Sequence, residues 1–328
     1  MVSFKHFLRT TLNPAMYHGH GKKLPFFEGW YFKLINADET RRYAIIPGVF
    51  LGEDAHSFIQ VLNGNSAKSA YHRFDVAEFW ASKDLFDIRV GSNYFSADHL
   101  KLSLDDPLGK IFGEIRFEQI HPWPVSVLSP GIMGWYAWMP MMECYHGVLS
   151  LDHGLQGCLE IDGETVDFSG GRGYIEKDWG HLFPEGYVWF QSNHFDTVET
   201  SITGSVAVIP WLGSAFRGFI IGLWHGQKLY RFATYTGAKI EHFSITDDQV
   251  DWVVRNRHFR LEMIASRVEG GLLHEPTGKT MLQRVEETML ATVKVRLSTL
   301  DGNVIFDEMG RNSGMEVQGD LEKLLAMK

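Results

Sequence analysis

Residues 30–50 read Trp-Tyr-Phe-Lys-Leu-Ile-Asn-Ala-Asp-Glu-Thr-Arg-Arg-Tyr-Ala-Ile-Ile-Pro-Gly-Val-Phe. Two runs rich in β-branched and aromatic residues flank an Asn-Ala-Asp turn, which is typical of antiparallel strands. Similar runs recur between turn signals at residues 57–62, 85–90, 100–104, 111–117, 147–151, 157–161, 187–192, 201–209, 216–224, 228–235, 249–254, 260–266 and 292–298. This spacing predicts an all-β, antiparallel protein. Only residues 320–326 have helical spacing, with Asp320 at the start, and they predict a short C-terminal helix.

The two halves of the chain share a local pattern. Phe-Phe-Glu-Gly-Trp-Tyr at residues 26–31 aligns with Phe-Pro-Glu-Gly-Tyr-Val at residues 183–188, and an Ile/Val-Ile-Pro motif follows in both halves. Similarity at such a long offset favours duplication of a whole domain, although a match this short also arises by chance. A chain of 328 residues is long enough for two domains. We expect these domains to comprise residues 1–142 and 143–328.

Composition limits the classes of function. The aromatic share of 13% suits a thick β core or a ligand cavity walled by rings. A net charge of −9 disfavours binding to nucleic acid. Two cysteines cannot form a multi-bridge disulfide framework, and the N-terminal residues lack the apolar run of a secretory signal. These features predict a cytoplasmic protein.

Residues 119–142 contain no Asp, Glu, Lys or Arg and are numerous enough to cross a bilayer. The segment also contains Pro122, Pro124, Pro130 and Pro140, which remove backbone donors and break any helix. It is therefore not a transmembrane helix. Two interpretations stay open: a buried connection between the domains, or an apolar lip around a cavity or against a membrane surface.

The stretch with most candidate chemistry, residues 170–181, reads Gly-Gly-Arg-Gly-Tyr-Ile-Glu-Lys-Asp-Trp-Gly-His. Its glycines lack the spacing of a phosphate-binding loop, and no helical pattern follows. If the stretch is extended, Tyr174, Glu176 and Asp178 share one face. If this face lines an apolar cavity, desolvation and the repulsion between the two carboxylates raise the pKa of at least one of them. That carboxyl group then stays protonated near neutral pH and is able to donate a proton. Alternatively, both face solvent or pair with Lys177 and Arg172.

A second candidate segment contains Glu143, Cys144, Tyr145 and His146. Glu143 and His146 have the Glu-x-x-His spacing of helix-borne metal sites, but the required helices and second copy are missing, so we expect no metal. Cys144 lacks an accompanying oxyanion-hole motif, which argues against a nucleophile. We expect Glu143, Tyr145 and His146 to be polar groups in the lining of a cavity.

Alternation along the predicted strand at residues 187–192 places Trp189, Gln191 and Asn193 on one face. Amides beside an indole ring are suited to orient a hydroxyl or carbonyl group of a ligand. Alternatively, both side-chain amides form hydrogen bonds with the backbone at the edge of a strand.

Together these motifs resemble the tocopherol cyclase family. The resemblance rests on residues 27–33, 142–147, 173–180 and 189–193, which occur in order along the chain. The Tyr-Ile-Glu-Lys-Asp-Trp-Gly run at residues 174–180 is also similar to a signature of carotenoid 1,2-hydratases and related AttH-like, lipocalin-like proteins. The resemblance implies two lipocalin-like β-barrel domains and an enzyme, of the isomerase or lyase type, that protonates an alkene.

The implied reaction closes a chromanol-type ring on a prenylated phenol or hydroquinone and requires no metal or cofactor. On this basis Asp178 and Glu176, with His146, are the expected catalytic residues. Trp30, Trp179 and Trp189 are expected to stabilise the cation, at a site where the two halves meet under residues 119–142. The full set of expected substrate-binding residues is Glu28, Trp30, Tyr31, Trp138, Glu143, Tyr145, Tyr174, Trp179, Trp189, Gln191 and Asn193.

Two other functions stay open. One is a non-catalytic, lipocalin-like carrier of an apolar isoprenoid, and the other is a carotenoid-hydratase-like enzyme in which water captures the cation. No transit-like extension precedes the first motif, so another prenylated phenol, a quinol or a polyene is an alternative substrate. The expected partner is an apolar small molecule rather than nucleic acid, and the expected location is cytoplasmic or peripheral to a membrane.

Overall fold

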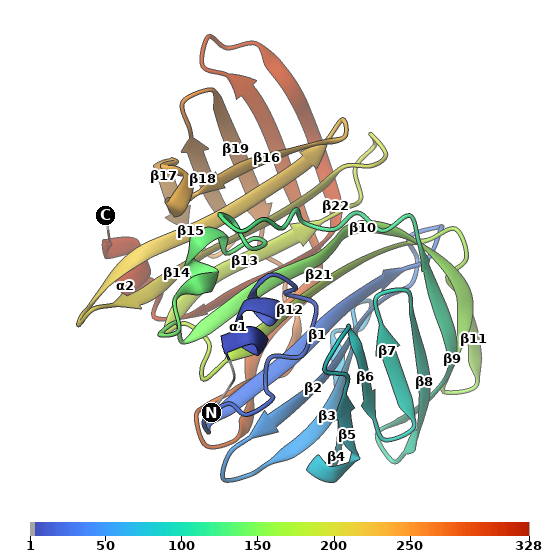
Figure 1. Ribbon diagram of the computed structural model, residues 1–328. Helices are drawn as coiled ribbons and strands as arrows, with labels where there is room; N and C mark the ends of the chain where they lie inside the picture. Colours follow the sequence, from blue (N-terminus) through green and yellow to red (C-terminus); the bar gives the residue numbers. More distant parts are fainter. Residues whose placement is uncertain (1–3, 328) are drawn as a thin grey trace. The chain divides into compact units, whose positions relative to one another are not determined.

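The computed structural model describes residues 4–327, and they form an all-β protein with a few short helices (Figure 1). The antiparallel, all-β prediction is confirmed. The chain divides into two compact units, which are described separately below. The first unit comprises residues up to 183 together with 272–284, and the second comprises residues 184–271 and the remainder from 285. The expected boundary at residues 142/143 lies inside the first unit.

The first unit contains a sheet of twelve strands whose order is β4-β3-β2-β1-β12-β10-β9-β8-β7-β6-β5, with β11 paired to β10. The central strand, β12, lies antiparallel between β1 and β10. The strands are β1 (Phe26–Ile35), β2 (Arg42–Leu51), β3 (His56–Asn63), β4 (Lys68–Asp75), β5 (Phe79–Ala81), β6 (Asp87–Val90), β7 (Asn93–Ser96), β8 (His99–Asp106), β9 (Gly109–Glu118), β10 (Cys144–Ile161), β11 (Glu164–Asp167) and β12 (Arg172–Gly180).

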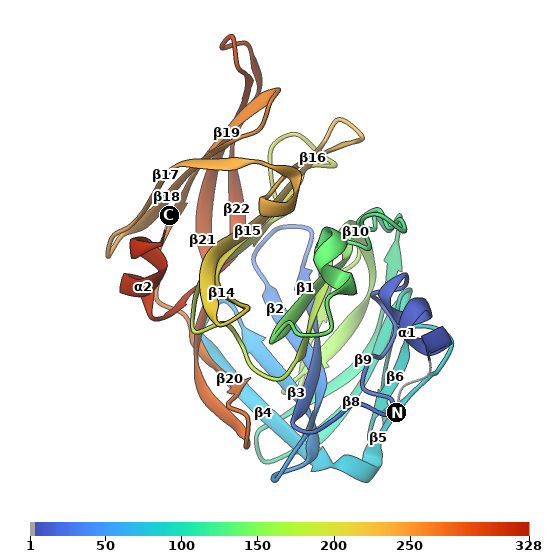
Figure 2. The same cartoon turned by 60° about the vertical axis from the view of Figure 1, so that its left-hand side comes forward.

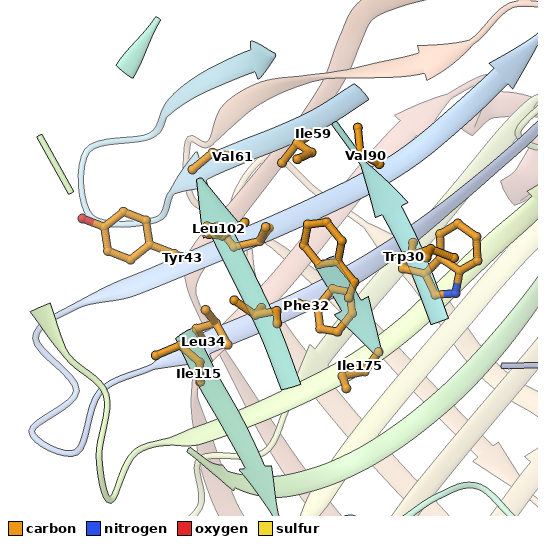
Figure 3. Packing of buried hydrophobic residues seen from close by; sticks show 14 of the residues in the cluster. Trp30, Phe32, Leu34, Tyr43, Ile59, Val61, Val90, Leu102, Ile115 and Ile175 are labelled. Atoms are coloured by element: carbon orange, nitrogen blue, oxygen red, sulfur yellow. The ribbon is translucent and has the colours of Figure 1, made fainter. Parts of the chain in front are cut away.

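The core of the first unit forms because alternate side chains of each strand are apolar and point to the same face. Trp30, Phe32 and Leu34 of β1 are completely buried there. Ile59 of β3 and Val90 of β6 belong to the same cluster, although these strands lie toward opposite ends of the strand order (Figure 3). The sheet therefore curls until its two ends share one apolar interior.

The second sheet has ten strands in the order β16-β15-β14-β13-β22-β21-β19-β18-β17, with β20 paired to β21. Most of β20 and the first residues of β21 fall within residues 272–284 of the first unit, and the other strands belong to the second unit. In both sheets the first strand in sequence pairs with the next strand in sequence, as β1 does with β2 (Figure 2), and also with the last strand of the sheet. The strands are β13 (Gly186–Ser192), β14 (Ser201–Trp211), β15 (Ser214–His225), β16 (Lys228–Ala233), β17 (Lys239–Ile245), β18 (Gln249–Arg255), β19 (Phe259–Ser266), β20 (Gly271–Pro276), β21 (Met281–Thr299) and β22 (Val304–Gly319).

This shared strand order supports the proposed duplication. The two copies of the Glu-Gly-aromatic motif lie at β1 and at the start of β13, which hold equivalent places in their sheets. The following Ile-Pro motifs lie in β2 and β14, the next strands along.

Helices are short. The C-terminal helix α2 (Leu321–Ala326) is confirmed, and the Asp320 side chain caps it by accepting a hydrogen bond from the backbone of Lys323. Helix α1 (Phe4–Thr11) was not predicted from the sequence, because two turns ending in two threonines carry little helical signal. Three 3₁₀ turns complete the set: η1 (Val76–Glu78), η2 (Gly134–Trp138) and η3 (Thr234–Thr236). Within residues 4–327, no helix has the length and apolarity needed to cross a bilayer.

Candidate active site

The strand β12 presents different chemistry on its two faces. Ile175 and Trp179 point into the apolar interior of the first unit. Tyr174, Glu176 and Asp178 alternate with them and share the opposite face, as the sequence predicted for an extended segment. Opposite Asp178 in the register lies His146 of β10.

On that face His146, Glu176 and Asp178 form what we call the acid cluster. The His146 Nδ1 atom lies 2.9 Å from Asp178 Oδ1, and its Nε2 atom lies 3.6 Å from Glu176 Oε2. The Tyr174 hydroxyl donates a hydrogen bond of 2.5 Å to Glu176 Oε2. The two carboxylates are thus held by a histidine and a tyrosine, whereas the basic residues considered from the sequence pair elsewhere: Arg172 with Asp152, and Lys177 with Glu28.

The charges in the acid cluster favour a protonated His146 at neutral pH. Burial by itself lowers the pKa of His146, but the adjacent negative charges of Glu176 and Asp178 outweigh it and raise the pKa to about 9. The imidazole is therefore an imidazolium at pH 7. Ligand atoms of the three residues lie within 4.8 Å of one another, which is close enough to hold a metal ion. A metal ion bound there would have to displace the proton of His146.

A cavity of about 80 Å³ has His146 in its wall, together with Tyr145 and Trp179 from the other face of the strand pair; Glu176 and Asp178 do not line it. Two segments cover it: the N-terminal segment around α1 and the proline-rich segment around η2. This volume is smaller than that of cavities that enclose a whole drug-sized ligand. A ligand of that size therefore enters only in part, unless these segments move. Every residue that lines the cavity belongs to the first unit: Phe7, Thr10, Thr11, Pro14, His18, Lys22, Pro130, Met133, Ala137, Pro140, Tyr145, His146 and Trp179.

Part of residues 119–142 lies at the cavity, where Pro130, Met133, Ala137 and Pro140 line it. Tyr145 anchors this segment by donating a short hydrogen bond to the carbonyl of Met139.

Behind the cavity, inside the first unit, lies a buried ion cluster of His18, Glu28 and Lys177. Glu28 and Lys177 are completely buried and form an ion pair. The Lys177 Nζ atom also donates to the carbonyl of Met16 at 2.7 Å and lies 3.1 Å from His18 Nδ1. Glu28 accepts a 2.8 Å hydrogen bond from the backbone N–H of His18. The cluster thereby ties the N-terminal segment to β1 and β12.

Burial and mutual interaction set the charges of this cluster. Burial lowers the pKa of Lys177 to about 8, and Glu28 opposes that shift. Burial raises the pKa of Glu28, but the ammonium of Lys177 outweighs it and holds the pKa below its usual value. Burial and the same ammonium lower the pKa of His18 to about 4, so its imidazole is neutral at pH 7. One buried cation therefore faces one buried anion.

The aromatic residues expected to stabilise a substrate cation surround this lysine. The Lys177 ammonium lies 4.7 Å from the ring centre of Trp30 and 4.8 Å from that of Trp179. Trp179 is stacked between His18 and Tyr145, at ring-centre distances of 4.1 and 5.4 Å. A cation of the protein itself thus occupies the faces of Trp30 and Trp179. Of the residues in this group, His18, Tyr145 and Trp179 also line the cavity.

The other expected residues are distributed over both units. Tyr31 is buried opposite Glu176 in the register of β1 and β12. The Trp138 indole of η2 donates a hydrogen bond to the carbonyl of Val127, and the backbone carbonyl of Glu143 accepts one from His181. Glu28 is buried in the ion cluster rather than exposed to the cavity. The remaining three are buried in the second unit, Trp189 and Gln191 on β13 and Asn193 just after it.

Sequence reasoning missed His18, Lys177 and helix α1 as parts of the site. Alternation along β12 places Lys177 on the face opposite the carboxylates, but a lysine between two acidic residues is usually expected to be exposed to solvent. A usable signal is the absence of Asp and Glu before Glu28 in an acidic chain, which marks the N-terminal segment as distinct.

Comparisons with known proteins define the class and then the family. Three solved structures share the fold over most of the chain: kievitone hydratase from Nectria haematococca (TM-score 0.51, 11% identity, 90% of each chain), CghA with Sch210972 (0.56, 10%, 90% of this chain and 89% of that one), and a putative AttH from Nitrosomonas europaea (0.50, 12%, 92% and 98%). The protein is thus of the lipocalin-like, all-β class.

Residues 114–319 match the model of the Tocopherol cyclase-like family, and the chain belongs to that family. Among curated proteins it is similar to a probable chloroplastic tocopherol cyclase of Oryza sativa subsp. japonica, at 24% identity over 92% of this chain and 77% of the relative. A chloroplastic tocopherol cyclase of Zea mays is 23% identical with the same coverage. The family match includes β10, β12 and β13, hence all three members of the acid cluster.

Proposed function

We propose that this protein is a cyclase that closes a chromanol-type ring on a prenylated phenol or hydroquinone, with a proton supplied by the acid cluster. Family membership and the hydratase-type fold relatives support an enzyme of the cyclase or hydratase type. The observation that carries the finer proposal is the acid cluster itself: His146, which contributes to the cavity wall, lies 2.9 Å from Asp178 and 3.6 Å from Glu176.

The proposed reaction needs no change in oxidation state. The acid cluster transfers a proton to the less substituted carbon of the prenyl double bond, which leaves a tertiary cation on the other carbon. The phenol oxygen attacks this cation, an O–C bond forms, and the phenol proton returns to the acid cluster. The product is an isomer of the substrate. The cavity keeps bulk water from capturing the cation, and the rings of Tyr145 and Trp179 line it.

Incubation in D₂O tests the reaction. A geranylgeranyl- or phytyl-hydroquinone dispersed in detergent should yield a chromanol with one deuterium at the carbon that received the proton, without any added cofactor. Mass spectrometry and NMR of the product locate the label. Addition of a water molecule, with oxygen from labelled water, would identify a hydratase instead. Recovery of bound but unchanged ligand would identify a carrier, and either result contradicts the cyclase proposal.

The pH dependence of the reaction should follow the proton on His146. Its pKa is raised in the folded protein, so the donor is present below about pH 9 and is lost as the pH rises through that value. We expect kcat/KM to be flat through neutral pH and to fall about tenfold per pH unit above about 9. Thermal unfolding at each pH serves as the control for stability. A rate that rises through pH 9 in folded protein would exclude His146 as donor.

A further inference from the structure

The proline-rich segment displays two aliphatic side chains at the tip of a tight turn. Ser126 and Ser129 exchange backbone hydrogen bonds of 3.1 Å in both directions. Val127 and Leu128 lie between them, with exposed fractions of 65% and 87%. The Trp138 indole holds the turn in place by donating a 2.9 Å hydrogen bond to the Val127 carbonyl. The exposure is therefore a feature of an anchored turn.

Further apolar residues of the same segment are exposed. Val125, Trp135 and Met141 each expose at least 40% of their surface. No Asp, Glu, Lys or Arg occurs between residues 119 and 142. Isolated exposed aliphatic residues need no explanation, but an exposed apolar segment beside a cavity indicates an interaction surface.

The neighbouring N-terminal segment supplies positive charge. The Phe7 ring packs edge-on against Trp138, at 5.9 Å between ring centres, so the two segments are adjacent. Residues 4–27 contain four basic residues, Lys5, Arg9, Lys22 and Lys23, and no Asp or Glu, although the chain as a whole carries a charge of −9. Arg9 pairs with Asp84. Lys5, Lys22 and Lys23 are exposed, as is Leu24.

We propose that these two segments form a docking surface for an anionic lipid bilayer. The Val127–Leu128 turn inserts its side chains at the boundary of the acyl chains, and Lys5 and Lys23 contact the phosphate groups of the lipids. Charge complementarity selects this partner, because a basic, apolar patch on an acidic protein matches a negatively charged lipid surface. The proposal goes beyond the cyclase reaction. It also places the part of the cavity wall formed by Pro130 and Met133 close to the membrane, where a prenyl lipid would enter without crossing water.

Co-sedimentation with lipid vesicles tests the proposal without any substrate. The full chain should bind vesicles of phosphatidylcholine mixed with phosphatidylglycerol. The double variant Val127→Asp/Leu128→Asp should lower the partition coefficient at least about tenfold, because two charges replace inserted aliphatic groups. The variant Lys5→Glu/Lys23→Glu should lower it about tenfold or more on the anionic vesicles only, and salt should weaken binding of the unmodified protein.

A matched control comes from the second unit, where Val198 and Leu212 are exposed to 73% and 78%. Val198→Asp/Leu212→Asp changes the same residue types and should leave vesicle binding unaltered. Thermal unfolding checks that all variants are folded. Two results would overturn the proposal: failure of the unmodified protein to bind anionic vesicles, or unchanged binding by Val127→Asp/Leu128→Asp. Loss of a lipid-free dimer in that variant, with vesicle binding retained, would assign the surface to a second copy of the chain.

Discussion

Replacement of Lys177 by methionine should lower the free energy of unfolding by about 3–5 kcal/mol, because it leaves the Glu28 carboxylate buried without its counter-charge. Both side chains are completely buried, and water cannot compensate the loss. The substitution also removes the hydrogen bond to the Met16 carbonyl and the ammonium between Trp30 and Trp179. Urea denaturation followed by tryptophan fluorescence measures the effect.

Two further variants isolate the cause. The double variant Lys177→Met/Glu28→Gln removes both charges and keeps an acceptor for the His18 backbone, so it should recover a large part of the lost stability. Arg41→Met breaks a solvent-exposed pair with Glu164 and should cost no more than about 1 kcal/mol. If Lys177→Met cost as little as Arg41→Met, the buried ion cluster would not contribute to the stability of the first unit.

Removal of the imidazole in His146→Ala should lower kcat by about 10²–10⁴-fold, the range expected when a general acid is lost. Asp178→Asn and Glu176→Gln should lower kcat as well, since each removes a negative charge that keeps His146 protonated. They should also move the alkaline limb of the pH profile to lower pH, because the pKa of His146 then falls. Steady-state kinetics on the prenylated hydroquinone, together with NMR titration of His146, provide the two readouts.

The first unit contains a matched control for these variants. His72 and Asp106 form another His–Asp pair, 2.7 Å apart, and neither contacts the acid cluster or lines the cavity, whereas His146 does line it. Asp106→Asn should therefore leave kcat and the pH profile unchanged. If Asp178→Asn and Glu176→Gln retained full turnover, the carboxylates would not belong to the proton donor. If the NMR titration of His146 were also unchanged, the electrostatic coupling itself would be refuted.

Local features of the fold and site were predictable because they depend on neighbours in the chain. Alternating β-branched and aromatic runs indicate strands regardless of which strands pair. In the same way, the two-residue period places Tyr174, Glu176 and Asp178 on one face of β12 whatever surrounds them. The four prolines in residues 119–142 exclude a membrane-spanning helix by local chemistry. Helix α1 was not predicted because its two turns contain too few residues to show a helical periodicity of apolar side chains.

Contacts between distant residues were not predictable. His146 meets Asp178 because β10 pairs with β12 in one particular register, which includes bulges that no local pattern reveals. The contribution of residues 119–142 to a cavity wall likewise depended on where the N-terminal segment packs. Glu28, expected to touch a substrate, is buried beside Lys177 instead, since the register of β1 and β12 brings both to the interior.

The sequence by itself determined the all-β class, the alternation of side chains along β12 and the presence of two carboxylates on one face. Each of these follows from backbone geometry over a few residues. Only the tertiary structure decided which charged partners these groups have. The carboxylates contact His146 on the neighbouring strand, and Lys177, which lies between them in the sequence, pairs with Glu28. Pairing register and desolvation set these partners and their pKa values, and both arise only when strands far apart in the chain pack together.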